Sequence, residues 1–147
     1  MALKQANGFS LVELIAVLVI LGVLASTATS ILLPSRTLQL QAARDQVIAA
    51  LFAAQQLAMT QSGGVRASVG AGQIDIREDL NSNGDFSDDV SQRVGGVQYP
   101  ISLLKSQSIS SLHFDYNRLG QTSGGLITLS QDSSAVVITV TDSGYAY

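Results

Sequence analysis

The feature that most constrains this chain is an uncharged, mostly apolar run over residues 14–35, close to the N-terminus. At about 1.5 Å per residue, a helix of this length crosses the roughly 30 Å hydrocarbon layer of a membrane. The positive charges ahead of the run are Lys4 and the starting amine, so the positive-inside tendency keeps the short leader in the cytoplasm. The sequence therefore predicts a single-pass membrane protein with a transmembrane helix at residues 9–33 and its C-terminal bulk across the membrane. In a bacterium these places are the inner membrane and the periplasm.

Two simpler interpretations of this segment compete with that prediction. A secretory signal peptide has an apolar segment of only about 7–15 residues, ending in a small-residue cleavage site. The run at residues 14–35 is too long for that. A plain membrane anchor explains the hydrophobicity but leaves Glu13 unexplained. A carboxylate in a membrane helix costs on the order of 2–3 kcal/mol at the centre and less near the end. Glu13 therefore needs a partner.

Residues 8–13 read Gly-Phe-Ser-Leu-Val-Glu and lead directly into the apolar run. This segment resembles the prepilin signature shared by type IV pilins and the pseudopilins of type II secretion. The resemblance implies that a membrane-embedded prepilin peptidase cuts between Gly8 and Phe9 and that Phe9 becomes N-methylated. Residues 1–8 would then be the prepilin leader.

Cleavage would also give Glu13 a counter-charge. The new ammonium group at Phe9 lies four residues before Glu13, on the same helical face. The resemblance implies that Glu13 instead pairs with the amine of a neighbouring subunit. Buried ion pairs are better at specifying register than at adding stability, which suits the assembly of a filament.

A helical pattern continues beyond the apolar run. Pro34 lacks a backbone N–H and clashes with the carbonyl four residues earlier, so we expect a kink there. Residues 36–61 predict an amphipathic helix, because apolar residues recur at three- and four-residue spacing; they are Leu40, Ala43, Val47, Leu51, Ala54 and Ala58. The glycine pair at 63–64 ends this helix. Residues 9–61 are thus expected to form one long, kinked helix.

Short strands are expected in the rest of the chain. Residues 73–77 and 112–116 alternate between apolar and polar types, which predicts buried side chains at Ile74, Ile76, Leu112, Phe114 and Tyr116. Residues 126–129 and 135–140 flank a turn-rich segment and predict an antiparallel hairpin. Residues 65–69 and 94–99 are two further candidate strands.

A long helix followed by antiparallel strands is an α+β order, in which the sheet covers the apolar stripe of the helix. We expect a type IV pilin fold with a periplasmic domain at residues 34–147, made of the helix at 36–61 and a sheet at 65–147. Residues 112–120 and the hairpin after them are similar to the ends of minor pilins, in particular H-type pseudopilins and mannose-sensitive haemagglutinin (MSHA) minor pilins. The chain has no cysteine, whereas major pilins usually close a C-terminal loop with a disulfide, so a minor subunit is favoured.

An acidic segment at residues 78–89 could bind calcium. Oxygen-bearing side chains alternate around Gly84 as in EF-hand loops, and the candidate ligands are Asp79, Asn81, Asn83, Asp85, Asp88 and Asp89. The twelfth position is Val90 and not the usual glutamate, so Asp88 or Asp89 would have to close a shorter loop. The alternative is a solvated turn, where Asn, Asp and Gly are favoured without a metal.

Catalysis and nucleic-acid binding find little support in the sequence. The single histidine, His113, lies in an expected strand as an exposed residue, and no catalytic triad can be assembled around it. The net charge is −3 and the basic residues beyond the leader are scattered, so we expect neither nucleic-acid binding nor enzyme activity. No cofactor other than calcium is expected.

The sequence thus predicts a structural subunit of a type IV pilus or a type II secretion pseudopilus, without choosing between them. Its expected partners are the prepilin peptidase, other pilins or pseudopilins of the filament, and the inner membrane. Two alternatives remain: a surface module that binds a ligand or adhesion target through the sheet and the acidic loop, and an anchored periplasmic enzyme.

Overall fold

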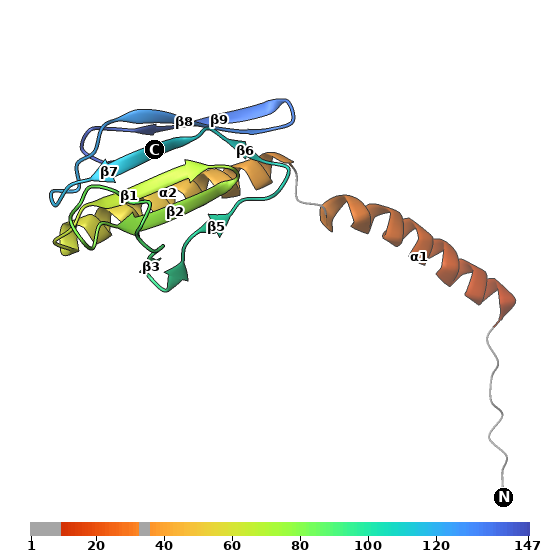
Figure 1. Ribbon diagram of the computed structural model, residues 1–147. Coiled ribbons are helices and arrows are strands. Elements are labelled where there is room, and N and C mark those ends of the chain that lie inside the picture. Colours follow the sequence, from red (N-terminus) through yellow and green to blue (C-terminus); the bar gives the residue numbers. More distant parts are fainter. Residues whose placement is uncertain (1–9, 33–35) are drawn as a thin grey trace, which may run out of the picture. The chain divides into compact units, whose positions relative to one another are not determined.

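The computed structural model describes residues 10–32 and 36–147 of the chain. The chain divides into two units, Met1–Ser35 and Arg36–Tyr147, and Figure 1 shows both, with every helix and strand except β4 labelled. The described part of the first unit is a single helix. The second unit combines a helix with antiparallel strands.

Helix α1 spans Leu11–Leu32. Its large apolar side chains from Leu11 to Leu24 are exposed. Within the described residues, no helix is both long and apolar enough to cross a membrane. The leader at residues 1–8, the cleavage site and the expected kink at Pro34 lie outside the described residues, so the transmembrane segment and the continuity of the long helix stay predictions.

Helix α2 spans Arg36–Thr60, one residue shorter than expected. All six residues of the predicted apolar stripe are buried, and Ala50 joins them. Alanine makes up four of the seven buried positions, at Ala43, Ala50, Ala54 and Ala58. Such small side chains let strands approach the helix closely. The burial of the whole stripe confirms the predicted amphipathic helix.

The first sheet contains β1 (Val65–Gly70), β2 (Gln73–Glu78), β5 (Ile101–Ser102) and β7 (Leu112–Tyr116), in the order β5-β2-β1-β7. All neighbours are antiparallel. Strand alternation places Ile74, Ile76, Phe114 and Tyr116 in the core, as the sequence predicts. The opposite face carries polar side chains.

Another sheet has the order β6-β8-β9, built from β6 (Ser108–Ile109), β8 (Gly125–Gln131) and β9 (Ser134–Val140). Strands β8 and β9 form the predicted hairpin, and their pairing extends to Gln131 opposite Ser134. The loop is therefore shorter than expected. Asp132 enables this tight turn with a φ of 52°, a left-handed conformation that aspartate tolerates.

Two expectations were wrong. Residues 94–99 do not form one strand but two short ones, β3 (Arg93–Val94) and β4 (Val97–Gln98). The reason is the pair Gly95 and Gly96, whose positive φ angles of 56° and 86° reverse the chain between them. Leu112 is 37% exposed and not buried, because it is the first residue of an edge strand with a neighbour on one side only.

Helix α2 packs against β1, β2, β7, β8 and β9 and forms one core with them. In Figure 1, α2 runs behind β1 and β2, roughly along their length. The fully buried strand residues Val65, Ala67, Ile127, Leu129 and Ile138 meet the apolar face of the helix. The α+β architecture is confirmed.

Candidate functional site

The N-terminal motif is described from Ser10 onward, at the start of α1. The carbonyl oxygen of Ser10 accepts hydrogen bonds from the backbone N–H groups of Glu13 (3.0 Å) and Leu14 (3.2 Å). Ser10 is therefore the N-cap residue of the helix, with Glu13 in the third helical position. Gly8 and Phe9, the expected cleavage and methylation residues, lie outside the described residues.

Glu13 lies in the first turn of α1 and is exposed. A carboxylate is favourable there because the helix macrodipole is positive at its N-terminus. This position leaves the side chain accessible to a partner beyond the helix. The proposed ion pair to an amine is not tested by the described residues.

The acidic loop follows β2 directly, and its first residue is its anchor. Asp79 is only 7% exposed. Its carboxylate accepts hydrogen bonds from the backbone N–H groups of Asn83 (3.1 Å) and Gly84 (2.8 Å). Gly84 has a φ of 78°, which glycine adopts without strain. Asp79 thus shapes the loop whether or not a metal is bound.

The other candidate ligands also accept hydrogen bonds from the loop. Asp88 accepts from the amides of Asn81 (2.9 Å) and Asn83 (3.1 Å). The backbone N–H of Ser87 donates to Asp85 at 2.9 Å and lowers the pKa of that carboxyl. In the part of the chain that the structure describes, no three acidic or histidine side chains converge on one point. The calcium site stays a prediction.

One atom of the loop lacks a partner. Asp89 accepts a 3.3 Å hydrogen bond from the backbone N–H of Leu80 through Oδ1. Its Oδ2 atom is buried, and no hydrogen bond reaches it from the described residues. Asp89 is therefore the loop acid with spare capacity to accept a further bond.

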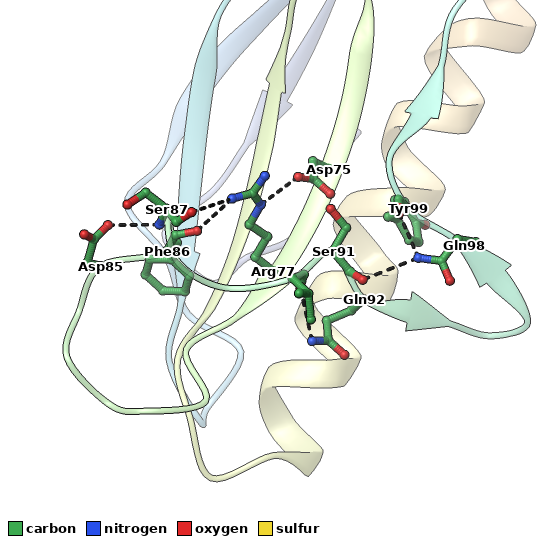
Figure 2. A network of polar contacts seen from close by, with 10 residues as sticks. Asp75, Arg77, Asp85, Phe86, Ser87, Ser91, Gln92, Gln98 and Tyr99 are labelled. Atoms are coloured by element: carbon green, nitrogen blue, oxygen red, sulfur yellow. Dashed lines mark hydrogen bonds and ion pairs between the residues drawn. The ribbon is translucent and has the colours of Figure 1, made fainter.

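A polar network joins this loop to the outer face of the first sheet (Figure 2). Arg77 on β2 donates from Nε to Asp75 at 2.8 Å, and from Nη1 to the carbonyl oxygens of Phe86 (2.9 Å) and Ser87 (3.4 Å). The guanidinium of Arg66 lies 4.3 Å from the centre of the Phe86 ring, a cation–π contact. Two arginines thus hold the loop on the sheet.

The loop and the sheet border a shallow cleft of about 380 Å³. Its lining is mixed in charge, since Arg66 and Arg77 face Asp75 and Asp85. Arg66 is itself paired with Asp115 through a 2.8 Å bond, which raises the pKa of its guanidinium. The sequence analysis missed this cleft. The only local sign of the cleft in the sequence was the pair of outward-facing polar residues Asp75 and Arg77 in one strand. The position of Phe86 against the sheet depends on the path of the loop, which the sequence pattern does not indicate.

His113 is exposed on β7, as expected. No hydrogen bond or ion pair of its side chain is seen within residues 10–32 and 36–147.

Two comparisons match known proteins. Residues 3–29 match the family described as the prokaryotic N-terminal methylation motif. The fold is similar to a crystal structure of the type IV minor pilin FimU from Pseudomonas aeruginosa, with a TM-score of 0.55 and 12% identity. That similarity covers 73% of this chain and 90% of the FimU chain. No curated protein matches the sequence.

The fold behind the N-terminal motif is that of the type IV pilins. Residues 3–29 add the N-terminal methylation motif to a fold similar to that of a type IV minor pilin.

Proposed function

We propose that this protein is a minor pilin or pseudopilin, a structural subunit of a type IV pilus or a type II secretion pseudopilus. The observation that carries the proposal is the presence, in one chain, of the methylation motif at residues 3–29 and a pilin fold behind it. In this function the chain is not an enzyme. It is a substrate of the prepilin peptidase.

The N-terminal segment would act in two stages. Residues 9–33 hold the precursor in the inner membrane, with residues 34–147 in the periplasm. Cleavage between Gly8 and Phe9, and methylation of Phe9, then prepare the helix for assembly. The exposed position of Glu13 in the first turn supports a role in pairing with the amine of a neighbouring subunit.

Mass spectrometry of the protein purified from membranes tests this processing. The mature chain should begin at Phe9 and carry an added methyl group. Gly8→Leu should leave the leader attached and keep the chain in the membrane, whereas Ala6→Leu, inside the leader but away from the bond, should be processed normally. A wild-type chain that keeps residues 1–8 in cells with an active prepilin peptidase would refute the proposal.

Gene neighbourhood separates the filament role from its alternatives. Genes for a prepilin peptidase, an assembly ATPase and other pilin-like chains nearby would support it, and their identity would separate pilus from secretion system. An isolated gene would favour an anchored periplasmic enzyme. That alternative has no supporting site in the described residues.

A second candidate function is ligand binding at the filament surface. The observation in its favour is the cleft beside Arg77, where donors and acceptors lie together and Asp75 Oδ1 is buried without a partner among the described residues. Arg77→Lys would be expected to weaken binding of a glycan or peptide found by array screening. An array with no reproducible binder would count against it.

A further inference from the structure

The acidic loop after β2 contains a reactive pair of residues, Asn83 followed by Gly84. Glycine has no side chain to shield its backbone nitrogen, which can therefore attack the side-chain amide of a preceding asparagine. Both residues are exposed. The space that a Cβ atom of Gly84 would occupy is open, with no atom within 4 Å. No side chain therefore stands in the way of this attack.

The nitrogen that would attack already contacts a base. The backbone N–H of Gly84 donates to Oδ2 of Asp79 at 2.8 Å, a distance at which a carboxylate can act as a general base. Asp79 is only 7% exposed, and its Oδ1 atom accepts a 3.1 Å hydrogen bond from the N–H of Asn83. The carboxylate is therefore held against the proton that the Gly84 nitrogen must lose.

The amide that would be attacked is also held by hydrogen bonds. The backbone N–H of Asp85 donates to Oδ1 of Asn83 at 2.6 Å. Negative charge develops on this oxygen when a nucleophile adds to Cγ, and a fixed backbone donor stabilises it, as in an oxyanion hole. The Nδ2 atom of Asn83, which would leave, donates to Asp88 at 3.1 Å. The loop thus supplies a base, an oxyanion donor and an oriented leaving group.

We propose that Asn83 is a site of spontaneous deamidation and that the loop accelerates the reaction. The Gly84 nitrogen bonds to Cγ of Asn83 while Asp79 takes its proton. The bond from Cγ to Nδ2 then breaks, Asp79 returns the proton, and the nitrogen leaves as ammonia. Water opens the resulting succinimide and leaves aspartate or isoaspartate at position 83. The proposal does not depend on leader processing or filament entry.

The product would carry a new negative charge within the acidic loop. The amide of Asn83 that donates to Asp88 is replaced by a carboxylate, so a hydrogen bond is lost and two like charges face each other. In isoaspartate the main chain also runs through the former side chain, which displaces Gly84 from Asp79. The amide hydrogen of Gly84 should therefore exchange faster with solvent after the reaction than before it.

The full chain in mild detergent at neutral pH tests the proposal, with a chelator present to remove calcium. Peptide mapping by mass spectrometry follows the replacement of NH2 by OH at Asn83. Mapping also separates this site from Asn7, the other asparagine followed by glycine. The reference is a synthetic peptide of residues 78–89 under the same conditions. We expect Asn83 to deamidate at least about tenfold faster in the folded chain than in the peptide.

Two substitutions test the role of Asp79. Asp79→Asn keeps the size of the side chain and an acceptor oxygen but removes the base, so it should slow the reaction at least about tenfold. Asp89→Asn is the matched control, because it removes the same charge from the same loop. Asp89 accepts its hydrogen bond from Leu80 and not from Asn83 or Gly84, so this variant should react at the wild-type rate.

Three results would overturn the proposal: a folded chain in which Asn83 keeps its amide, a rate in the folded chain no faster than in the peptide, or equal rates in Asp79→Asn and Asp89→Asn. Circular dichroism checks the fold of both variants.

If Asp79→Asn disturbs the domain, the pH dependence of the wild-type chain decides. Hydroxide must remove the proton in the peptide, so that rate should rise with pH. Asp79 removes it in the folded chain, so the rate there should change much less. The same dependence on pH in both would reject Asp79 as the base.

Discussion

The Nη1 atom of Arg77 donates a 2.9 Å hydrogen bond to the carbonyl oxygen of Phe86, nine residues further along the chain. The same guanidinium bonds Asp75, whose side chain is only 13% exposed. Arg77→Ala should leave both acceptors without this donor and cost about 1–3 kcal/mol of unfolding free energy, measured by urea denaturation.

Arg93→Ala is the control, since Arg93 is exposed and makes one long hydrogen bond of 3.3 Å to Gly96. It should change stability by less than about 0.5 kcal/mol. Equal losses for the two variants would mean that Arg77 does not hold the loop.

Glu13→Gln should reduce entry into filaments while membrane insertion and leader cleavage continue. The amide keeps the size of the side chain but loses the charge that would attract a neighbour's amine. Immunoblots of sheared filaments and of membranes measure how much of the chain is assembled and how much stays in the membrane. Ser10→Ala is the control, because it changes the N-cap side chain of the same helix but keeps the charge of Glu13. It should enter filaments as the wild type does. Normal incorporation of Glu13→Gln would remove the ion-pair mechanism.

Calcium should raise the melting temperature if the loop of Asp79 binds it. Ligand present at about 100 times its dissociation constant adds about 2.7 kcal/mol to stability. Asp88→Asn should abolish the shift while leaving the metal-free melting temperature nearly unchanged, since Asp88 is exposed. Magnesium serves as the control cation. No shift at millimolar calcium would leave the loop as a turn held by its own hydrogen bonds.

Tyr116 should make the protein sensitive to alkaline pH. Its burial raises the pKa of its hydroxyl to about 12, against about 10 in an unfolded chain. The protonated form is therefore favoured by folding, so this contribution is complete below about pH 10 and is lost as the pH rises towards 12. Urea denaturation at several pH values should reveal a loss of about 2–3 kcal/mol.

Tyr116→Phe should remove that part of the pH dependence. The hydroxyl is buried without a hydrogen-bond partner among the described residues, so its loss at neutral pH should be neutral or stabilising. Tyr147→Phe, at an exposed position, should behave as wild type. An unchanged alkaline slope in Tyr116→Phe would contradict the assignment.

Gly144 should not tolerate a side chain. It has a φ of 83°, and a Cβ atom there would overlap the carbonyl oxygen of Gly120. Gly72 has a similar φ of 71° but open space around it, so Gly72→Ala should cost about 1–2 kcal/mol for the backbone conformation alone. Gly144→Ala should cost clearly more in chemical denaturation. Equal costs would mean that the close approach relaxes easily.

The sequence by itself determined the elements whose signals are local. The stripe from Leu40 to Ala58 and the alternation in residues 73–77 repeat within one element, so side-chain periodicity is enough to place the buried face. The methylation motif is equally local, because it is read from consecutive residues. The fold class followed from the order of these elements.

Tertiary structure alone decided how distant segments meet. The turn at Gly95 and Gly96 split an expected strand, and an edge position left Leu112 exposed. The hydrogen bond from Arg77 to Phe86 and the pairing of Thr139 with Tyr147 join segments whose contact no local sequence pattern indicates. Such contacts depend on the path of the chain between them, which periodicity does not encode.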